Sequence, residues 1–406
     1  MISDAQNEVE QSPHLLTPWQ CRGVRLKNRM VLAPMQVYAG KDGFPSQWHL
    51  HHLAKFALGG FGTVFTEALI VTPEGRNTPA DLGIWSDEFI ASLSQIAASL
   101  RALGVTPATQ LLHCGPKAAR QRPWDGYGPL GEADAARGEP PWQPVAPSPD
   151  PRVQGWLSPR ELTVPEIHTL VEAFAAGARR CAAAGFDILD IHAAHGYLLH
   201  SFYSPLGNDR QDAYGGDRNG RMRFLLEVTE SVRAAWPADK PLFVRLSCID
   251  GEEGGWSLED TIELSRALVE RGADLIDCSS RGIGLSTTAR VLSRLPGFQV
   301  PFAERVRREV SIPTMAVGLI LNGHQAEEIV RDGRADLVCI AREALKNPHW
   351  ALHAVQALGS SRWDLWPPAY GWWLERREGQ LRLGEKDLRE GRSSAIFACD
   401  RDAYPR

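Results

Sequence analysis

Eight short apolar runs alternate with longer helix-like segments along the chain, and this alternation limits the fold more than any other feature. The runs are residues 30–35, 63–68, 106–113, 186–193, 242–247, 275–280, 313–317 and 337–341. Apolar strands separated by helices are typical of parallel sheets covered on both faces. Eight such units are the number needed to close a (β/α)8 TIM barrel, so we predict this fold of the α/β class. An open doubly wound sheet is the alternative.

The segments between the runs carry signals for helix starts. Thr163 and Glu166 have the spacing of a capping box, and an apolar stripe at helical intervals follows them over residues 167–181. Ser257 and Asp260 repeat that spacing before a second stripe. Both segments therefore predict helices that pack on the sheet.

The regular alternation predicts one barrel domain over residues 15–361, preceded by a polar N-terminal segment, 1–14. Residues 117–154 interrupt it after the third strand with a segment rich in Pro, Gly and Trp. We interpret this insertion as a long loop that packs on the barrel as a lid, because long loops in compact domains are often functional. Residues 362–406 form an aromatic and then charged C-terminal tail, which we expect to dock on the barrel or on a neighbouring subunit.

Composition narrows the classes of partner. The 44 basic and 49 acidic residues give a formal net charge of −5, so we expect no nucleic-acid partner. No apolar run reaches the roughly 18 residues of a membrane helix, so we expect no membrane partner. The start of the chain is polar, and the seven cysteines are far apart without a CxxC pair. We therefore predict reduced cysteines and a cytoplasmic protein with a small-molecule substrate.

Barrel enzymes carry their functional groups at the C-terminal ends of the strands. Polar residues gather at these positions here. They are Gln36, Tyr38, Thr66, Glu67, Gln110, His113, His192, His195, Tyr197, Arg245 and Arg342. The site is therefore expected at this end of the barrel.

His192 and His195 stand three residues apart at the end of the fourth strand, and three interpretations compete. As metal ligands they need a third partner such as His113, but no HxH or HExxH pattern supports this, and we predict no metal site. As hydrogen-bond donors, two imidazoles hold one carbonyl or phenolate oxygen and stabilise negative charge on it. As packing residues they have no chemical role. The donor and packing interpretations both stay open.

Two glycine-containing segments are candidates for a phosphate site. Residues 126–131 spell GxGxxG, but they lie inside the Pro-rich insertion without the strand and helix that a dinucleotide fingerprint requires, and we reject them. The turns after strands seven and eight, with Gly318, Ala341 and Arg342, are the better candidate. Barrels often hold a phosphate there with backbone amides and a helix start.

These residues together resemble the FMN-dependent old yellow enzymes, in particular the short bacterial ene-reductases and related reductases of aromatic CoA thioesters. The resemblance covers residues 15–370 and includes the run Ile191-His192-Ala193-Ala194-His195-Gly196-Tyr197-Leu198. Its other motifs lie at residues 26–29, 32–35, 66–68, 73–76, 110–115, 204–216, 244–247, 277–279 and 334–336.

The resemblance implies FMN as cofactor, NADPH or NADH as reductant, and reduction of an activated C=C bond by ping-pong hydride transfer. It makes the flavin neighbours Ala33, Pro34, Met35, Gln36, Ala68, Gln110 and Arg245, and the phosphate neighbours Gly318, Ala341 and Arg342. It implies substrate contacts from Gln36, Tyr38, His192 and His195, and a proton donor in Tyr197. It also implies a homo-oligomer, a dimer or a tetramer.

The chain departs from the family pattern at three places, one of which is that the insertion up to Gln154 and the last 36 residues have no clear counterpart in the family. Gln36 stands where such enzymes commonly carry a cysteine or threonine, so flavin potential and substrate range are expected to differ. The tail at residues 367–372 lacks the arginine that some members insert into a neighbour's site, unless Arg376 or Arg377 replaces it. Gln36 and the altered tail motivate one alternative, a redox-neutral isomerase or tailoring enzyme on the same barrel. Two further alternatives are an inactive flavin-binding protein and a metal-dependent hydrolase.

Overall fold

The computed structural model describes residues 13–149, 156–284, 291–360 and 362–392. The chain divides into two compact units, the first ending at Leu358 and the second beginning at Gly359. Each unit is described by itself.

The first unit is a closed barrel of parallel strands, as the sequence predicts. Its strands pair in the order β3-β4-β5-β8-β9-β10-β11-β12, and β12 pairs with β3 to close the ring. They are β3 (Met30–Leu32), β4 (Thr63–Ile70), β5 (Thr106–Leu112), β8 (Ile188–Ala193), β9 (Leu242–Ser247), β10 (Leu275–Ser279), β11 (Thr314–Ala316) and β12 (Leu337–Ile340). The open-sheet alternative is therefore wrong.

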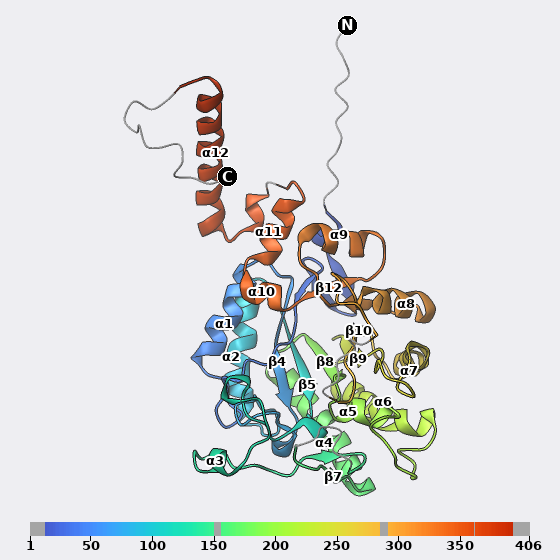
Figure 1. The fold of residues 1–406 in the computed structure, drawn as a ribbon. Coiled ribbons are helices and arrows are strands. Elements are labelled where there is room, and N and C mark those ends of the chain that lie inside the picture. The colour runs from blue at the N-terminus through green and yellow to red at the C-terminus, as the bar shows by residue number, and fades with distance from the viewer. Residues whose placement is uncertain (1–12, 150–155, 285–290, 361, 393–406) are drawn as a thin grey trace. The chain divides into compact units, whose positions relative to one another are not determined.

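Each barrel strand is followed by a helix, and Figure 1 shows these helices outside the strands. They are α1 (Gln47–Leu58), α2 (Phe89–Ala102), α4 (Val164–Ala183), α6 (Arg218–Ala235), α7 (Leu258–Glu270), α8 (Val300–Val310), α9 (Gly323–Arg331) and α11 (Trp350–Ala357). Both predicted capping boxes are confirmed. Thr163 Oγ1 accepts from the Glu166 amide at the start of α4, and Ser257 Oγ accepts from the Asp260 amide at the start of α7.

A short hairpin, β1 (Trp19–Cys21) and β2 (Val24–Leu26), covers the N-terminal end of the barrel. Its Trp19 joins the core cluster of inward-facing strand residues and meets Phe243 edge-on, with ring centroids 6.3 Å apart. The barrel is thus filled and closed at this end, which leaves the opposite end for the site.

The insertion after β5 has more structure than the predicted long loop. It contains a four-residue helix α3 (Glu132–Ala135) and the strand β6 (Val145–Ala146), which pairs with β7 (Arg160–Glu161). The buried guanidinium of Arg120 lies 3.8 Å from the ring centroid of Tyr127 and 3.7 Å from that of Trp156. These cation–π contacts help to order the segment. They leave no periodic pattern in the sequence, so sequence reasoning does not detect them.

The second unit contains a helix, α12 (Pro368–Arg389), where the sequence predicts only an aromatic and charged tail. Proline occupies its first helical position, and straight-chain residues fill most of its later turns. Glu378 and Arg382 form an ion pair four residues apart, which supports a helix. The predicted docking of this segment stays a prediction.

None of the described helices is long and apolar enough to cross a membrane. The six described cysteines carry free thiols, as expected, and Cys399 lies outside the described residues.

Replacing Trp19 by Ala tests the role of the hairpin as the floor of the barrel. We expect the free energy of unfolding to fall by about 3 to 5 kcal/mol, because the change leaves a cavity against Phe243. Urea unfolding followed by circular dichroism measures it. The matched control Trp373→Ala removes an indole that is 66% exposed and is expected to cost less than about 0.5 kcal/mol. Equal losses in both variants would contradict this role.

Candidate active site

A cavity of about 500 Å³ opens at the C-terminal ends of β9 to β12. Its volume is in the range of ordinary cofactor and ligand sites. Four arginines line it, Arg245, Arg281, Arg294 and Arg342, together with His195 and the turn at Gly318. Gly318 has a φ of +112°, and a Cβ there would stand 2.6 Å from Gln299 Oε1. Positive charge and a close backbone turn suit an anionic group.

Five predicted site residues meet at this cavity: His195, Arg245, Gly318, Ala341 and Arg342. The other predicted residues follow neighbouring strands at the same end. Ala68 is the register partner of Gln110, and His192 is the register partner of Arg245. Pro34 follows the end of β3, whereas Ala33 and Met35 line a separate cavity of only about 10 Å³. The predicted residues thus share one end of the barrel.

A polar layer crosses the barrel interior below the cavity. Gln110 Nε2 donates to Asp190 Oδ2 at 2.6 Å, and Arg245 Nε lies 3.3 Å from Asp277 Oδ2. Burial, and then the charge of Asp277, raise the pKa of Asp190 well above its usual range. Burial likewise raises the pKa of Asp277, against the opposing effect of Arg245. The layer fixes the side chains of Gln110 and Arg245, because buried charges require paired groups.

His192 offers a free hydrogen-bond donor. The Ala194 amide donates to its Nδ1 at 3.1 Å, so a neutral ring carries its proton on Nε2. Burial, and then the nearby Arg245, lower its pKa well below the usual value, which keeps the ring neutral. The Ala194 amide makes the hydrogen bond to this ring, and no residue in the described part of the chain forms one with Nε2.

His195 adopts the left-handed backbone region, with a φ of +62°, which is uncommon for a residue with a side chain. Its amide donates to Ser247 Oγ at 2.9 Å, and its carbonyl accepts from Lys117 Nζ at 2.6 Å. Its Nε2 lies 2.8 Å from Ser279 Oγ. The two histidine rings lie 4.9 Å apart and nearly perpendicular, so they are neighbours, but His195 Nε2 already has a partner.

Tyr197 stands at the start of the short helix α5 (Leu198–Tyr203), with its ring centroid 5.1 Å from that of His192. Burial raises the pKa of its phenol well above the usual value, and the neighbouring Cys114 and Tyr38 add to this effect. The hydroxyl therefore keeps its proton at neutral pH, as a general acid must.

Gln36 and Tyr38 follow β3. Gln36 Oε1 accepts from the Ala68 amide at 2.7 Å, which leaves its buried Nε2 without a partner among the described residues. The Tyr38 hydroxyl accepts from Asn77 Nδ2 at 3.0 Å, and its ring meets Trp124 edge-on. An unpaired buried amide group of this kind suits a ligand with an acceptor.

Sequence reasoning gave no site role to Asp190, Asp277, Ser279 and Arg294, although Asp277 and Ser279 lie in the motif at residues 277–279. The two aspartates had a detectable signal, because alternate residues of a strand face the barrel interior and these share that face with His192 and Ser279. Arg294 lies between β10 and α8 in a stretch without periodicity, so no sequence signal marks it.

Among the described residues, no group of three His, Cys, Asp or Glu side chains is arranged to hold a metal ion. His113, the candidate third ligand, accepts from the Gly115 amide through Nδ1, and burial lowers its pKa to about 4. Its Nε2 has no hydrogen-bond partner within the described part of the chain.

Residues 14–360 match the family model of the NADH:flavin oxidoreductase / NADH oxidase family. The chain belongs to this family. An NADPH dehydrogenase of Geobacillus sp. (strain WCH70) is 43% identical over 349 residues, which cover 86% of this chain and 95% of the relative. The NADPH dehydrogenase of Bacillus subtilis is 38% identical over 348 residues, which cover 85% of this chain and 95% of that relative. The protein is thus an FMN-dependent NAD(P)H oxidoreductase, and the resemblance to old yellow enzymes is confirmed.

A solved structure of morphinone reductase shares the fold. It superposes with a TM-score of 0.69 at 25% identity, and the match covers 86% of this chain and 90% of that one.

The residues present fit an FMN group. The cavity with Gly318, Arg294 and Arg342 suits its phosphate, and the unpaired amide of Gln36 offers a donor to a flavin ring acceptor. The buried guanidinium of Arg245 lines the same cavity and carries positive charge. This charge would stabilise the negative charge of a reduced flavin.

The protonation state of His192 is directly measurable. We expect long-range ¹H–¹⁵N correlation spectra of ¹⁵N-histidine-labelled protein to show one neutral ring with its proton on Nε2 from pH 5.5 to pH 8. The reason is that burial lowers the pKa of His192 well below its usual value, and an imidazole is neutral at any pH above its pKa. Assignment by comparison with His192→Asn identifies the signal. A titration midpoint near 6.5 would contradict this geometry.

Proposed function

We propose that this protein reduces a C=C bond conjugated to a carbonyl group. The observation that supports this best is the free Nε2–H donor of His192 next to the protonated phenol of Tyr197. A donor that holds a carbonyl oxygen draws electrons from the conjugated alkene and makes its β-carbon a better hydride acceptor. A neighbouring phenol then delivers a proton to the α-carbon, unless water does so.

The other site residues orient the substrate and stabilise charge on the cofactor. His195 adds a second donor to the substrate oxygen when it exchanges Ser279 for that oxygen. Tyr38, in the segment after β3, limits the space for the substrate. Gln36, whose Nε2 has no partner among the described residues, and Gln110 would hold a bound flavin ring by hydrogen bonds, and Arg245 would stabilise negative charge on it. Bound FMN would supply the hydride chemistry that links oxidation of NAD(P)H to reduction of the alkene.

NADPH is the favoured reductant, because the curated relatives at about 40% identity are NADPH dehydrogenases. A cytoplasmic location and a dimeric or tetrameric assembly stay predictions from the sequence.

Anaerobic absorbance spectroscopy of the purified protein tests the reaction class. We expect flavin bands that bleach with NADPH and recover when cyclohexenone or N-ethylmaleimide is added. Recovery with the alkene and consumption of NADPH in equal amounts support C=C reduction. Flavin that bleaches and is reoxidised by neither alkene would overturn the proposal.

Replacing Tyr197 by Phe tests the proton donor. We expect reoxidation of the reduced protein by cyclohexenone to slow by about 100-fold, because this half-reaction needs the phenol proton. Reduction by NADPH does not need that proton and is expected to change little. Stopped-flow absorbance measures both half-reactions. The control Tyr214→Phe removes a hydroxyl that donates to Glu227 instead, and both rates are expected to stay unchanged. An unaltered reoxidation rate in Tyr197→Phe would assign the proton to water.

A further inference from the structure

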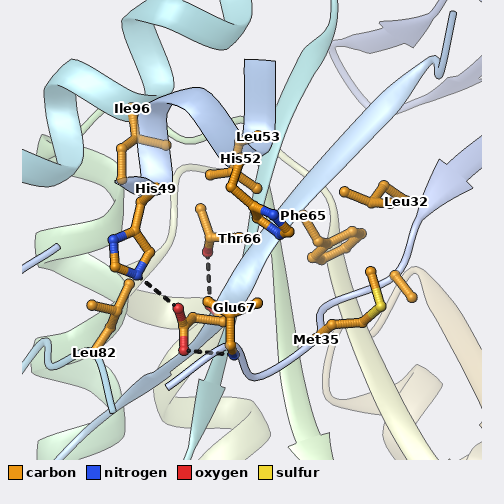
Figure 2. Close-up of a pocket in the computed structure, with 12 residues that line it drawn as sticks. Leu32, Met35, His49, His52, Leu53, Phe65, Thr66, Glu67, Leu82 and Ile96 are labelled. Atoms are coloured by element: carbon orange, nitrogen blue, oxygen red, sulfur yellow. Dashed lines mark hydrogen bonds and ion pairs between the residues drawn. The ribbon is translucent and has the colours of Figure 1, made fainter. Parts of the chain in front are cut away.

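Strand β4 contains a bulge next to the candidate site. Phe65 pairs with Ala108 and Ala68 pairs with Gln110, so Thr66 and Glu67 together oppose the single residue Thr109. A bulge of this kind redirects a side chain. Figure 2 shows the Glu67 carboxylate in the space between β4 and α1, close to His49.

Glu67 is a buried acceptor for several N–H groups. Its Oε1 lies 3.0 Å from His49 Nε2, and its Oε2 accepts from the Val37 amide at 3.3 Å. The Tyr38 amide is near enough to lower the pKa of the carboxyl, against the larger effect of burial. The Ser46 amide donates to His49 Nδ1 at 2.9 Å, so a neutral imidazole carries its proton on Nε2 and donates to Glu67. Helix α1, strand β4 and the segment after β3 therefore meet at one carboxylate.

The segment that Glu67 holds, residues 36–38, carries two candidate site residues. Tyr38 has a φ of +52°, a left-handed conformation that costs about 1 kcal/mol or more and persists only when its surroundings enforce it. The Ala68 amide, directly after Glu67, donates to Gln36 Oε1 at 2.7 Å. The bulge thus binds both ends of this segment.

A carboxylate is a poor choice for merely filling this space. The side chains of His49 and Glu67 are only 2% and 1% exposed, and burial of a carboxylate disfavours folding unless donors surround it. Apolar side chains from α1 and β4, among them Leu53 and Phe65, line the same small cavity, and an apolar residue would fill it at lower cost. A carboxylate has an advantage here because it accepts hydrogen bonds from backbone N–H groups. Residues 36–38 have no regular secondary structure that would otherwise pair these groups.

We propose that Glu67 is a positioning residue: with His49, it fixes residues 36–38 so that the Gln36 amide and the Tyr38 ring face the flavin and the substrate. This inference rests on the proposed function for the role of the two side chains. The hold on the backbone itself does not depend on that function.

The variant Glu67→Gln tests the proposal, because an amide keeps the shape but places N–H donors against either His49 Nε2 or the Val37 amide. Hydrogen exchange measured by mass spectrometry on the purified holoprotein reports the backbone directly. We expect peptides covering residues 36–40 to exchange about tenfold faster, while the barrel strands keep their protection. We also expect kcat/KM for cyclohexenone to fall roughly 10- to 100-fold, since small misplacements of site groups have effects of this size.

Asp274→Asn is the matched control. Asp274 accepts from the Leu242 amide at 2.8 Å and from Arg22 Nε at 2.7 Å, and it precedes β10 at the N-terminal end of the barrel. This variant loses comparable hydrogen bonds and is expected to leave exchange at residues 36–40 and kcat/KM unchanged. Equal acceleration at 36–40 in both variants would show general destabilisation and overturn the proposal.

A double-mutant cycle separates positioning from a structural role. In a Gln36→Ala/Tyr38→Ala background, Glu67→Gln is expected to lower kcat/KM by less than about twofold, because the groups it positions are gone. The full loss in that background would overturn the proposal. If Glu67→Gln does not fold, His49→Phe removes one donor and leaves the backbone contacts, and faster exchange at 36–40 is again expected; unchanged exchange overturns the proposal.

The exchange readout also distinguishes this inference from the proposed function. Wild-type protein that fails to reduce enones, with faster exchange at 36–40 in Glu67→Gln, would remove the proposed reaction and leave the positioning of the segment. Enone reduction by wild type, with unchanged exchange in the variant, would remove the positioning alone.

Discussion

Closure of the barrel is the constraint on which the other features depend. Ile340 on the last strand pairs with Leu32 on the first, and this parallel contact joins segments more than 300 residues apart. Once the ring is closed, the C-terminal ends of all eight strands surround one axis. The groups that follow β3, β4, β8, β9, β11 and β12 then face a common space, although no two neighbouring strands bring all of them together.

The interior of this barrel is apolar at one end and polar toward the other. Trp19 and Phe243 fill the floor, whereas Gln110, Asp190, Arg245 and Asp277 form a layer below the cavity. Buried ionised groups oppose folding unless they pair, so the layer is better explained by what it holds than by stability. It keeps a guanidinium and an amide in fixed directions under the cavity, which preorganises them for charge in a bound group.

Strain and buried hydrogen bonds concentrate at the same end. His195 and Tyr38 both have positive φ values, and each is held by contacts from another strand or loop. A backbone held in an unfavourable region does not relax when a ligand arrives, provided that its neighbours are rigid. The histidine, tyrosine and glutamine side chains therefore sit on segments that the barrel itself holds in place.

The sequence by itself determined the barrel, its eight strands, both capping boxes and the end of the barrel where the functional groups gather. These features follow from local periodicity and capping, which depend on residues close together in the chain. Only the tertiary structure decided that His195 is bonded to Ser279, that Asp190 and Asp277 hold Gln110 and Arg245, and that Glu67 turns outward at a bulge to bind residues 36–38. Each of these contacts joins residues 29 or more positions apart. Their geometry is set by strand register and by closure of the ring, which no local pattern encodes.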